Sequence, residues 1–262
     1  MTQISANAVS ANQVSWMPQS GLLVSARSMA EFKLIMSVGI RWLDLKEPSL
    51  GSLGMPSLDL IFSVLELDIP ESVQVSIAGG ELRSWTLDLD GALAAKLPAR
   101  AYLKLALAEC KGEQWQSVAE RISRALVRRS QLILVHYADS VSSNAPSWQE
   151  VIATTKSLGG KFVLVDTYCK KLGGLMDHYS IEQLEEMIGA ANQEKLGVAL
   201  AGSLKLDQLQ SLLNSRAAWL GVRGAVCRDT QRTGELCATK LQQALSLFNS
   251  RSFTEADHHV VG

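Results

Sequence analysis

Gly39-Ile40-Arg41-Trp42-Leu43-Asp44-Leu45-Lys46 is the stretch of the chain that most clearly indicates its fold. It is an apolar run that ends in a lysine, and its length and composition are typical of a buried strand. A glycine-rich segment, residues 47–54, follows it, and residues 57–66 then have helical periodicity. A strand, a loop and a helix in this order form the repeating unit of α/β proteins.

The same alternation recurs along the chain without a break in composition. We expect strands near 21–25, 42–46, 73–77, 101–106, 131–136, 161–166, 197–201 and 219–223. We expect helices near 28–38, 57–66, 86–96, 113–129, 147–158, 206–214 and 233–249, and one that begins at Ser180. Eight such units predict a single (β/α)8 TIM barrel over residues 21–250. A doubly wound open sheet is the alternative, but its GxGxxG turn after the first strand is absent.

Both ends of the chain differ from the predicted barrel. Residues 1–20 are rich in Ser, Asn, Gln and Ala and are expected to form a loose N-terminal extension, without the features of a signal peptide. Residues 251–262 are expected to form a polar C-terminal tail. A pair of glycines, Gly79 and Gly80, is expected to end the third strand.

Composition limits the classes of function. A hydrophobic content of 47% with 19% charged residues indicates a large core, and a net charge of −1 with dispersed basic residues argues against nucleic-acid binding. The four cysteines lack CxxC spacing, which argues against a zinc site and favours a reducing compartment. No window approaches the roughly 18 apolar residues of a membrane span. We therefore expect a cytoplasmic protein without a metal site.

Charged side chains stand at the carboxyl ends of alternate predicted strands, where the reactive groups of TIM barrels gather. Asp44 and Lys46 end the second strand, Lys104 lies in the fourth, and Asp166 ends the sixth with Lys170 in the loop after it. Inward-facing residues of alternate strands share a layer, so these groups are expected to converge. Burial and neighbouring cations favour a neutral lysine able to form a Schiff base, whereas the carboxylates oppose that shift. The sequence does not decide whether the pKa of Lys46 is raised or lowered overall. Taken alone, Lys46 could be a lysine that extends its ammonium to solvent, and each carboxylate could be part of a structural ion pair.

Glycine-containing loops after several strands suggest anion binding. Gly202 and Ser203 follow the seventh strand, and Arg223 and Gly224 follow the eighth, where TIM barrels commonly bind phosphate. Gly51 and Ser52, in the loop after Lys46, offer a second possible cradle. A glycine motif alone is more often a tight turn, but backbone N–H groups at strand ends can approach an anion closely.

A series of motifs resembles the signature of the (5-formylfuran-3-yl)methyl phosphate synthase family of methanofuran biosynthesis. The resemblance covers about residues 20–248 and rests on Asp44-Leu45-Lys46-Glu47-Pro48 with Gly51-Ser52-Leu53-Gly54, Tyr102-Leu103-Lys104, Tyr137-Ala138-Asp139, Asp166-Thr167 with Lys170, Ala199-Leu200-Ala201-Gly202-Ser203, and Gly221-Val222-Arg223-Gly224-Ala225-Val226-Cys227.

The resemblance implies a lyase that condenses two glyceraldehyde 3-phosphate molecules to (5-formylfuran-3-yl)methyl phosphate, with release of phosphate and water. It implies Lys46 as the Schiff-base lysine, Lys104 as the general acid/base, and Asp44, Asp166 and Lys170 in supporting positions. No cofactor is implied. The product would serve the biosynthesis of methanofuran or a related C1 carrier.

Two other functions stay open at this point. A class I aldolase or isomerase acting on other small sugar phosphates could use the same lysines, and a barrel can also act as a non-catalytic partner. The presence of both Lys46 and Lys104 argues against the non-catalytic partner. We expect a phosphorylated small-molecule substrate, no nucleic-acid or membrane partner, and a homo-oligomer, because exposed apolar helix faces of barrels often associate.

Overall fold

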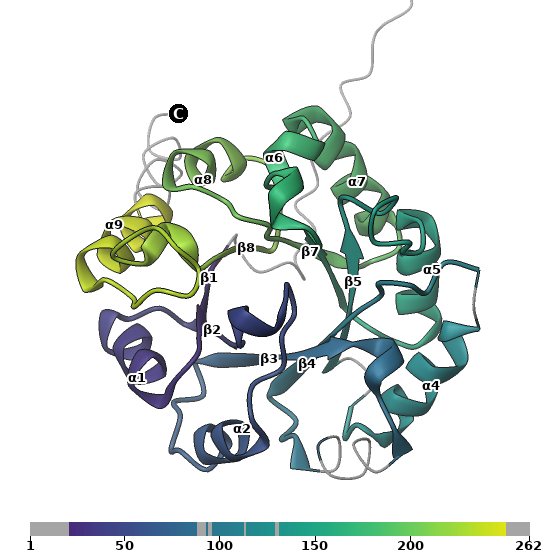
Figure 1. Ribbon diagram of the computed structural model, residues 1–262, viewed down its shortest axis with the longest axis horizontal. Coiled ribbons are helices and arrows are strands. Elements are labelled where there is room, and N and C mark those ends of the chain that lie inside the picture. The colour runs from purple at the N-terminus through teal and green to yellow at the C-terminus, as the bar shows by residue number, and fades with distance from the viewer. Residues whose placement is uncertain (1–20, 88–92, 94–95, 113, 129–130, 250–262) are drawn as a thin grey trace, which may run out of the picture.

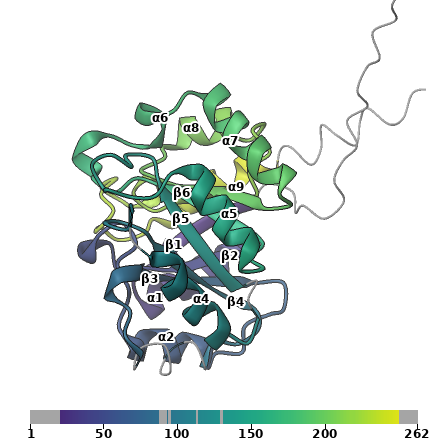
Figure 2. The same cartoon turned by 90° about the vertical axis from the view of Figure 1, so that its right-hand side faces the viewer.

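A computed structural model describes residues 21–249, apart from residues 88–92, 94–95, 113 and 129–130. Its strands form a closed barrel in chain order, with helices outside the ring (Figures 1 and 2). The strands are β1 (Gly21–Ala26), β2 (Trp42–Leu45), β3 (Gln74–Glu81), β4 (Ala101–Ala106), β5 (Leu132–Tyr137), β6 (Phe162–Asp166), β7 (Gly197–Leu200) and β8 (Trp219–Val222). The described α-helices are α1 (Met29–Val38), α2 (Leu58–Leu65), α4 (Trp115–Ala125), α5 (Trp148–Ser157), α6 (Leu175–His178), α7 (Ile181–Gln193), α8 (Leu206–Leu212) and α9 (Ala238–Asn249).

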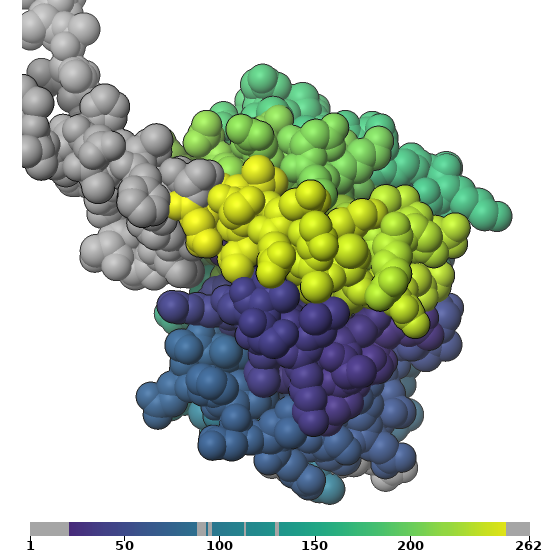
Figure 3. Space-filling view, turned by 90° about the vertical axis from the view of Figure 1, so that its left-hand side faces the viewer, coloured from purple at the N-terminus to yellow at the C-terminus, as the bar shows by residue number. Residues whose placement is uncertain are grey.

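The predicted TIM barrel is therefore confirmed. Every neighbouring pair of strands is parallel, and β1 closes the ring by pairing with β8. Three serines, Ser28, Ser147 and Ser180, begin helices where the sequence predicts, because each hydroxyl accepts the N–H of the residue three positions later. Figure 3 shows α9 lying against α1, so the last described helix covers the junction between the first and last strands.

Two predicted boundaries are wrong. Strand β3 does not end at Gly79 and Gly80 but continues to Glu81 through a shift in its register with β4. Glycine favours this close approach of β3 to β4, because a Cβ atom on Gly79 would lie 2.7 Å from the Leu105 side chain, which would then have to shift. The last helix begins at Ala238 instead of residue 233, since Cys227 and Leu236 form an antiparallel bridge that holds the preceding residues in a hairpin.

The N-terminal extension over residues 1–20 and the tail over residues 251–262 lie outside the described residues. Most of the helix expected over residues 86–96 does too.

Aromatic side chains fill the amino-terminal end of the barrel interior. Trp42, Tyr102, Phe162 and Trp219 come from the four even-numbered strands and contact one another, with ring centroids 4.2 Å apart for Trp42–Trp219 and for Phe162–Trp219. Four side chains from alternate strands form one layer of a TIM-barrel core. This aromatic layer closes the barrel below the charged residues that lie two and four positions further along the same strands.

The loop after β2 folds back over the other end of the barrel. Within this β2 loop (residues 46–57), Leu53 is buried in the interior cluster, and its carbonyl accepts the N–H of Gly80 at 2.9 Å. The buried hydroxyl of Ser52 donates to the carbonyl oxygens of Thr167 and Tyr168 in the loop after β6. The β2 loop is thereby tied to both β3 and the β6 side of the mouth.

The aromatic layer gives a test of the interior packing. We expect Trp219→Ala to lower the free energy of unfolding by about 3–5 kcal/mol, because it leaves a cavity among the aromatic rings. Urea denaturation would measure this. Val127→Ala is the control, since that side chain is 63% exposed and should change stability by less than about 0.5 kcal/mol. An equally small loss for Trp219→Ala would contradict a packed layer.

Candidate active site at the carboxyl ends of the strands

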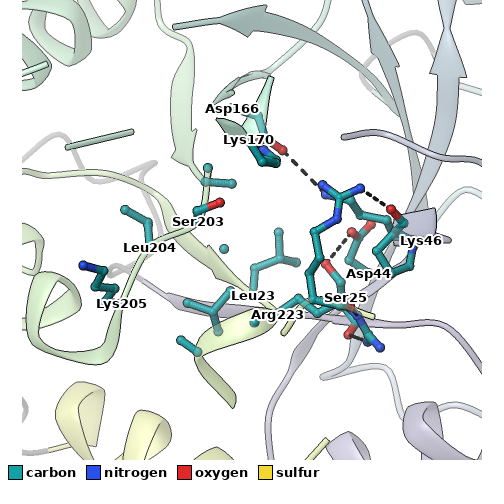
Figure 4. Close-up of a pocket in the computed structure, with 18 of the residues that line it drawn as sticks. Leu23, Ser25, Asp44, Lys46, Asp166, Lys170, Ser203, Leu204, Lys205 and Arg223 are labelled. Atoms are coloured by element: carbon teal, nitrogen blue, oxygen red, sulfur yellow. Dashed lines mark hydrogen bonds and ion pairs between the residues drawn. The ribbon is translucent and has the colours of Figure 1, made fainter. Parts of the chain in front are cut away.

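A cavity of about 710 Å³ opens at the carboxyl ends of the strands, within the usual size range for small-molecule sites (Figure 4). Its walls include the β2 loop, the β6 loop (residues 167–174), the β7 loop (201–205) and the β8 loop (223–237). Among its lining residues in the described part of the chain, seven carry cationic side chains and two carry carboxylates. The cavity therefore suits an anionic ligand.

The deeper charged pair joins β4 to β2. Lys104 Nζ lies 2.6 Å from Asp44 Oδ1, and both side chains are buried. Ser25 and Ser76, in register with Asp44 on the two neighbouring strands, donate their hydroxyls to its oxygens at 2.9 and 2.8 Å. Three donors thus hold one buried carboxylate, which stabilises its charge inside the barrel.

A second buried carboxylate lies one layer nearer the mouth. Asp166 Oδ1 accepts Lys170 Nζ at 2.8 Å and the N–H of Thr167 at 2.7 Å. Burial alone would raise the pKa of Asp166, but the charges of Lys170 and Lys46 and these hydrogen bonds together lower it to about 2. Lys170 is fixed in turn, because its ammonium also donates to the carbonyl and hydroxyl oxygens of Thr167, each at 2.6 Å.

Lys46 is held more loosely than the other two lysines. Its Nζ lies 3.6 Å from Asp166 Oδ2, beyond hydrogen-bonding distance, and its side chain is 14% exposed. The pKa of Lys46 is lowered from 10.5 to about 8: burial is the largest cause, Lys170 and Lys104 also lower it, and Asp166 and Asp44 oppose the shift. At pH 7 roughly a tenth of such amines are neutral. Lys46 therefore combines access to the cavity with a larger neutral fraction than an ordinary lysine has.

The five charged residues converge on one cavity, as the sequence predicts, but they lie in two layers of the barrel and not in one. Lys104 does not share a layer with Lys46 and Asp166 but pairs with Asp44 in the layer below. The reason is the period of two along a strand, which places Lys46 one inward position beyond Asp44. All five residues line the same cavity.

The predicted anion-binding residues divide into two groups. Gly202, Ser203 and Gly224 line the cavity, and no acceptor among the described residues binds the backbone N–H of Ser203 or Gly224. Gly51 and Ser52 are not among the lining residues, because the Ser52 hydroxyl is turned to the β6 loop and the Gly51 carbonyl accepts from Arg232. The structure therefore does not bring this second predicted cradle to the cavity.

Arg223 lines the cavity but directs its guanidinium away from Lys46, toward Ser25 (Figure 4). Its Nη1 donates to the Ser25 carbonyl at 2.8 Å and to Glu31 at 2.9 Å, and its Nη2 donates to Glu31 and to the Gly234 carbonyl. Its Nε donates to the Arg232 carbonyl. A guanidinium with this many partners fixes the β8 loop and has little capacity left for a ligand.

The geometry can be compared with known proteins. The model of the family described as 4-HFC-P synthase matches residues 22–245. The chain belongs to this family. A (5-formylfuran-3-yl)methyl phosphate synthase of Methanobrevibacter smithii is 29% identical over 236 residues, which is 87% of this chain and 99% of the relative. The synthase of Methanothermobacter thermautotrophicus has the same identity and coverage. The family resemblance predicted from the motifs is confirmed.

Solved structures support the fold of this 4-HFC-P synthase family member. Phosphoribosyl anthranilate isomerase from Thermus thermophilus superposes with a TM-score of 0.57 at 16% identity, covering 88% of this chain and 99% of the isomerase. Thiamine phosphate pyrophosphorylase from Pyrococcus furiosus gives a TM-score of 0.55 at 10% identity, covering 88% and 96%. At these identities the likeness concerns the barrel alone.

The described residues contain no group of three or more His, Cys, Asp and Glu side chains arranged to hold a metal ion. No helix among them has the length and hydropathy needed to cross a membrane.

Several residues of the family member's site were not predicted. Ser25 and Ser76 hold Asp44, and a signal for them exists, because each is a lone hydroxyl in an apolar strand. Arg232 lines the cavity from a polar loop without periodicity, so nothing in its surroundings points to a site.

The electrostatics of Lys46 can be tested by Asp166→Asn. Because Asp166 raises the pKa of Lys46, we expect this variant to shift that pKa further below about 8. NMR titration of lysine labelled at the ε-carbon would measure it. Asp207→Asn on the exposed face of α8 removes the same charge at a distance and should leave the Lys46 titration unchanged. An unchanged or higher pKa in Asp166→Asn would show that the carboxylate does not act on this amine.

Proposed function

We propose that this chain is a Schiff-base-forming lyase that condenses two glyceraldehyde 3-phosphate molecules to (5-formylfuran-3-yl)methyl phosphate, in the biosynthesis of methanofuran or a related C1 carrier. Family membership supports the product, since the curated relatives carry that name. The observation that carries the mechanism is the buried Lys46 amine, with a pKa of about 8, at the edge of a cavity rich in cations. We place the reaction in the cytoplasm.

The first step is imine formation on Lys46. The neutral amine adds to the aldehyde carbon, a C–N bond forms, and the carbonyl oxygen leaves as water. The protonated imine attracts electrons from the adjacent carbon, so the proton on that carbon can be removed to give an enamine. Lys170 on Asp166 favours the neutral amine needed for the attack by adding positive charge nearby.

Lys104 is the group proposed to move protons. It lies below Lys46 in the same cavity, and Asp44 with its two serine donors fixes the position of its ammonium. The enamine carbon forms the new carbon–carbon bond, one phosphate leaves by elimination, and ring closure and hydrolysis of the imine free Lys46. Atoms balance when two triose phosphates give one furan aldehyde phosphate, one phosphate and two waters.

The β7 and β8 loops are proposed to bind a substrate phosphate. Gly202 and Ser203 both have positive φ angles, 110° and 56°, which present the backbone of this turn to the cavity. Gly224 lies on the neighbouring loop. Backbone N–H groups with no protein acceptor can bind phosphate oxygens without an additional charged side chain.

Product analysis tests the reaction. Purified protein incubated with glyceraldehyde 3-phosphate should release inorganic phosphate and form a compound with furan absorbance in the ultraviolet. Mass spectrometry would identify it. A six-carbon aldol product formed without phosphate release would instead assign an aldolase, and no consumption of substrate would reject the lyase.

The role of Lys46 is tested by trapping. Borohydride reduction in the presence of substrate should fix a triose adduct on Lys46, and Lys46→Ala should abolish both the adduct and turnover. Lys171→Ala, an exposed lysine beside the site, should retain both. An adduct on a different lysine in the wild-type protein would remove Lys46 from the mechanism.

A test of the role of Lys104 must not leave its buried partner Asp44 without a cation. In Lys104→Met combined with Asp44→Asn, both charges are removed together, so the barrel should fold. The substrate should still form a trapped adduct on Lys46, while turnover should fall by about 10²–10⁴-fold because proton transfer is lost. Ser76→Ala removes one hydroxyl donor to Asp44 but keeps the Lys104–Asp44 pair, and it serves as the control. Turnover equal to that of the control would assign the proton transfer to another group.

A further inference from the structure

Arg232 is presented to the cavity by an ordered hairpin in the β8 loop. Cys227 bridges to Leu236, and the N–H of Arg228 donates to the Glu235 carbonyl at 2.9 Å, so the loop is paired at its base. Within the turn the N–H of Gly234 donates to the Gln231 carbonyl at 2.9 Å. These contacts fix the backbone on both sides of Arg232, which reduces the entropy lost when its side chain binds a ligand.

The guanidinium of Arg232 reaches from this hairpin to the β2 loop. Its Nη2 donates to the carbonyl of Pro48 and, at 2.9 Å, to the carbonyl of Gly51. Arg232 and Pro48 both line the cavity. The β2 loop begins at Lys46, so Arg232 connects the loop that bears the nucleophile with the loop that follows β8.

The charge of Arg232 is not matched by a carboxylate in contact. Among the described residues no Asp or Glu oxygen lies within 4.0 Å of its nitrogens, whereas Arg223 is paired with Glu31 at 2.9 Å. Burial lowers the pKa of Arg232, and the more distant Asp166 and Glu47 raise it. A guanidinium has five N–H donors, and the two carbonyls occupy only Nη2, so Nη1 and Nε remain for a ligand.

We propose that Arg232, and not Arg223, is the arginine that binds a substrate phosphate, and that its contacts with Pro48 and Gly51 couple this phosphate to the position of the Lys46 loop. The identity of the phosphate as part of a triose rests on the proposed function. The anion site itself does not depend on the proposed function, because it follows from a half-buried guanidinium that has no carboxylate in contact among the described residues. A planar guanidinium can donate two parallel hydrogen bonds to the oxygens of one phosphate, so Arg232 favours a phosphorylated sugar over an unphosphorylated one.

The charges of the cavity agree with this assignment. Two triose phosphate dianions bring four negative charges. The seven cations and two carboxylates that line the cavity leave a net charge of +5, or +4 once Arg223 is neutralised by Glu31. One phosphate on the backbone at Gly202, Ser203 and Gly224 and a second on Arg232, beside the β2 loop, would match this net charge.

Binding of a non-reactive ligand tests the site apart from the reaction. sn-Glycerol 3-phosphate has the phosphate of the substrate but no carbonyl, so it cannot form an imine. Calorimetric titration should show binding about ten- to a hundredfold weaker in Arg232→Gln than in the wild-type protein, because a charge-assisted pair of hydrogen bonds is lost. Arg232→Lys should be intermediate. Arg228→Gln, an exposed arginine of the same hairpin, is the matched control and should change binding less than about twofold.

A second measurement separates phosphate binding from support of the loop. Borohydride trapping of unphosphorylated glyceraldehyde on Lys46 should proceed in Arg232→Gln at nearly the wild-type rate, while trapping of glyceraldehyde 3-phosphate should need a higher concentration. Wild-type affinity for glycerol 3-phosphate in Arg232→Gln would overturn the proposal. An equal loss of trapping for both aldehydes would also overturn it, since the arginine would then only hold the β2 loop. Arg232-dependent binding without any furan product would retain this site and reject the proposed reaction.

Discussion

The site depends on two carboxylates that are kept charged inside a closed barrel. Burying an ion is costly unless donors replace the water it loses. Asp44 receives a lysine and two serine hydroxyls from three different strands, and Asp166 receives a lysine, a backbone N–H and the field of a second lysine. Because strands β1 to β4 and β6 all contribute to these contacts, the fold and the electrostatics of the cavity cannot be separated.

The same arrangement gives the lysines different roles. Lys104 and Lys170 have short contacts with carboxylates, at 2.6 and 2.8 Å, whereas Lys46 lies at 3.6 Å from Asp166. Because Lys46 lies too far from Asp166 for a hydrogen bond, burial is the largest influence on its pKa and lowers it. Three lysines within one cavity can therefore supply a nucleophile, a proton carrier and a fixed positive charge without a cofactor in the proposed scheme.

The fold could be predicted because its signal repeats. Each strand is a short apolar run, each helix has helical periodicity, and serines such as Ser147 and Ser180 mark helix starts, so one ambiguous element does not change the architecture. The charged groups Lys46, Lys104 and Asp166 could be predicted because an ion in a buried strand is unusual. Arg223 shows what the sequence does not reveal. Its charge and its position after β8 suited phosphate binding, but its guanidinium is paired with Glu31 in α1, 192 positions away. Tertiary pairing of this kind leaves no local pattern, and the same holds for Arg232.

The two contacts of Asp166, with Lys170 and with Lys46, have a consequence for the proposed catalytic cycle. When Lys46 gives up its proton, the carboxylate facing it would otherwise be left in the barrel without a cation, at a cost of several kcal/mol. Lys170 remains at 2.8 Å on the other side of the same carboxylate, so Asp166 always keeps one ammonium partner. Lys170 thus acts as a permanent counter-ion of Asp166. The carboxylate therefore stays paired both when Lys46 is protonated and when it is neutral.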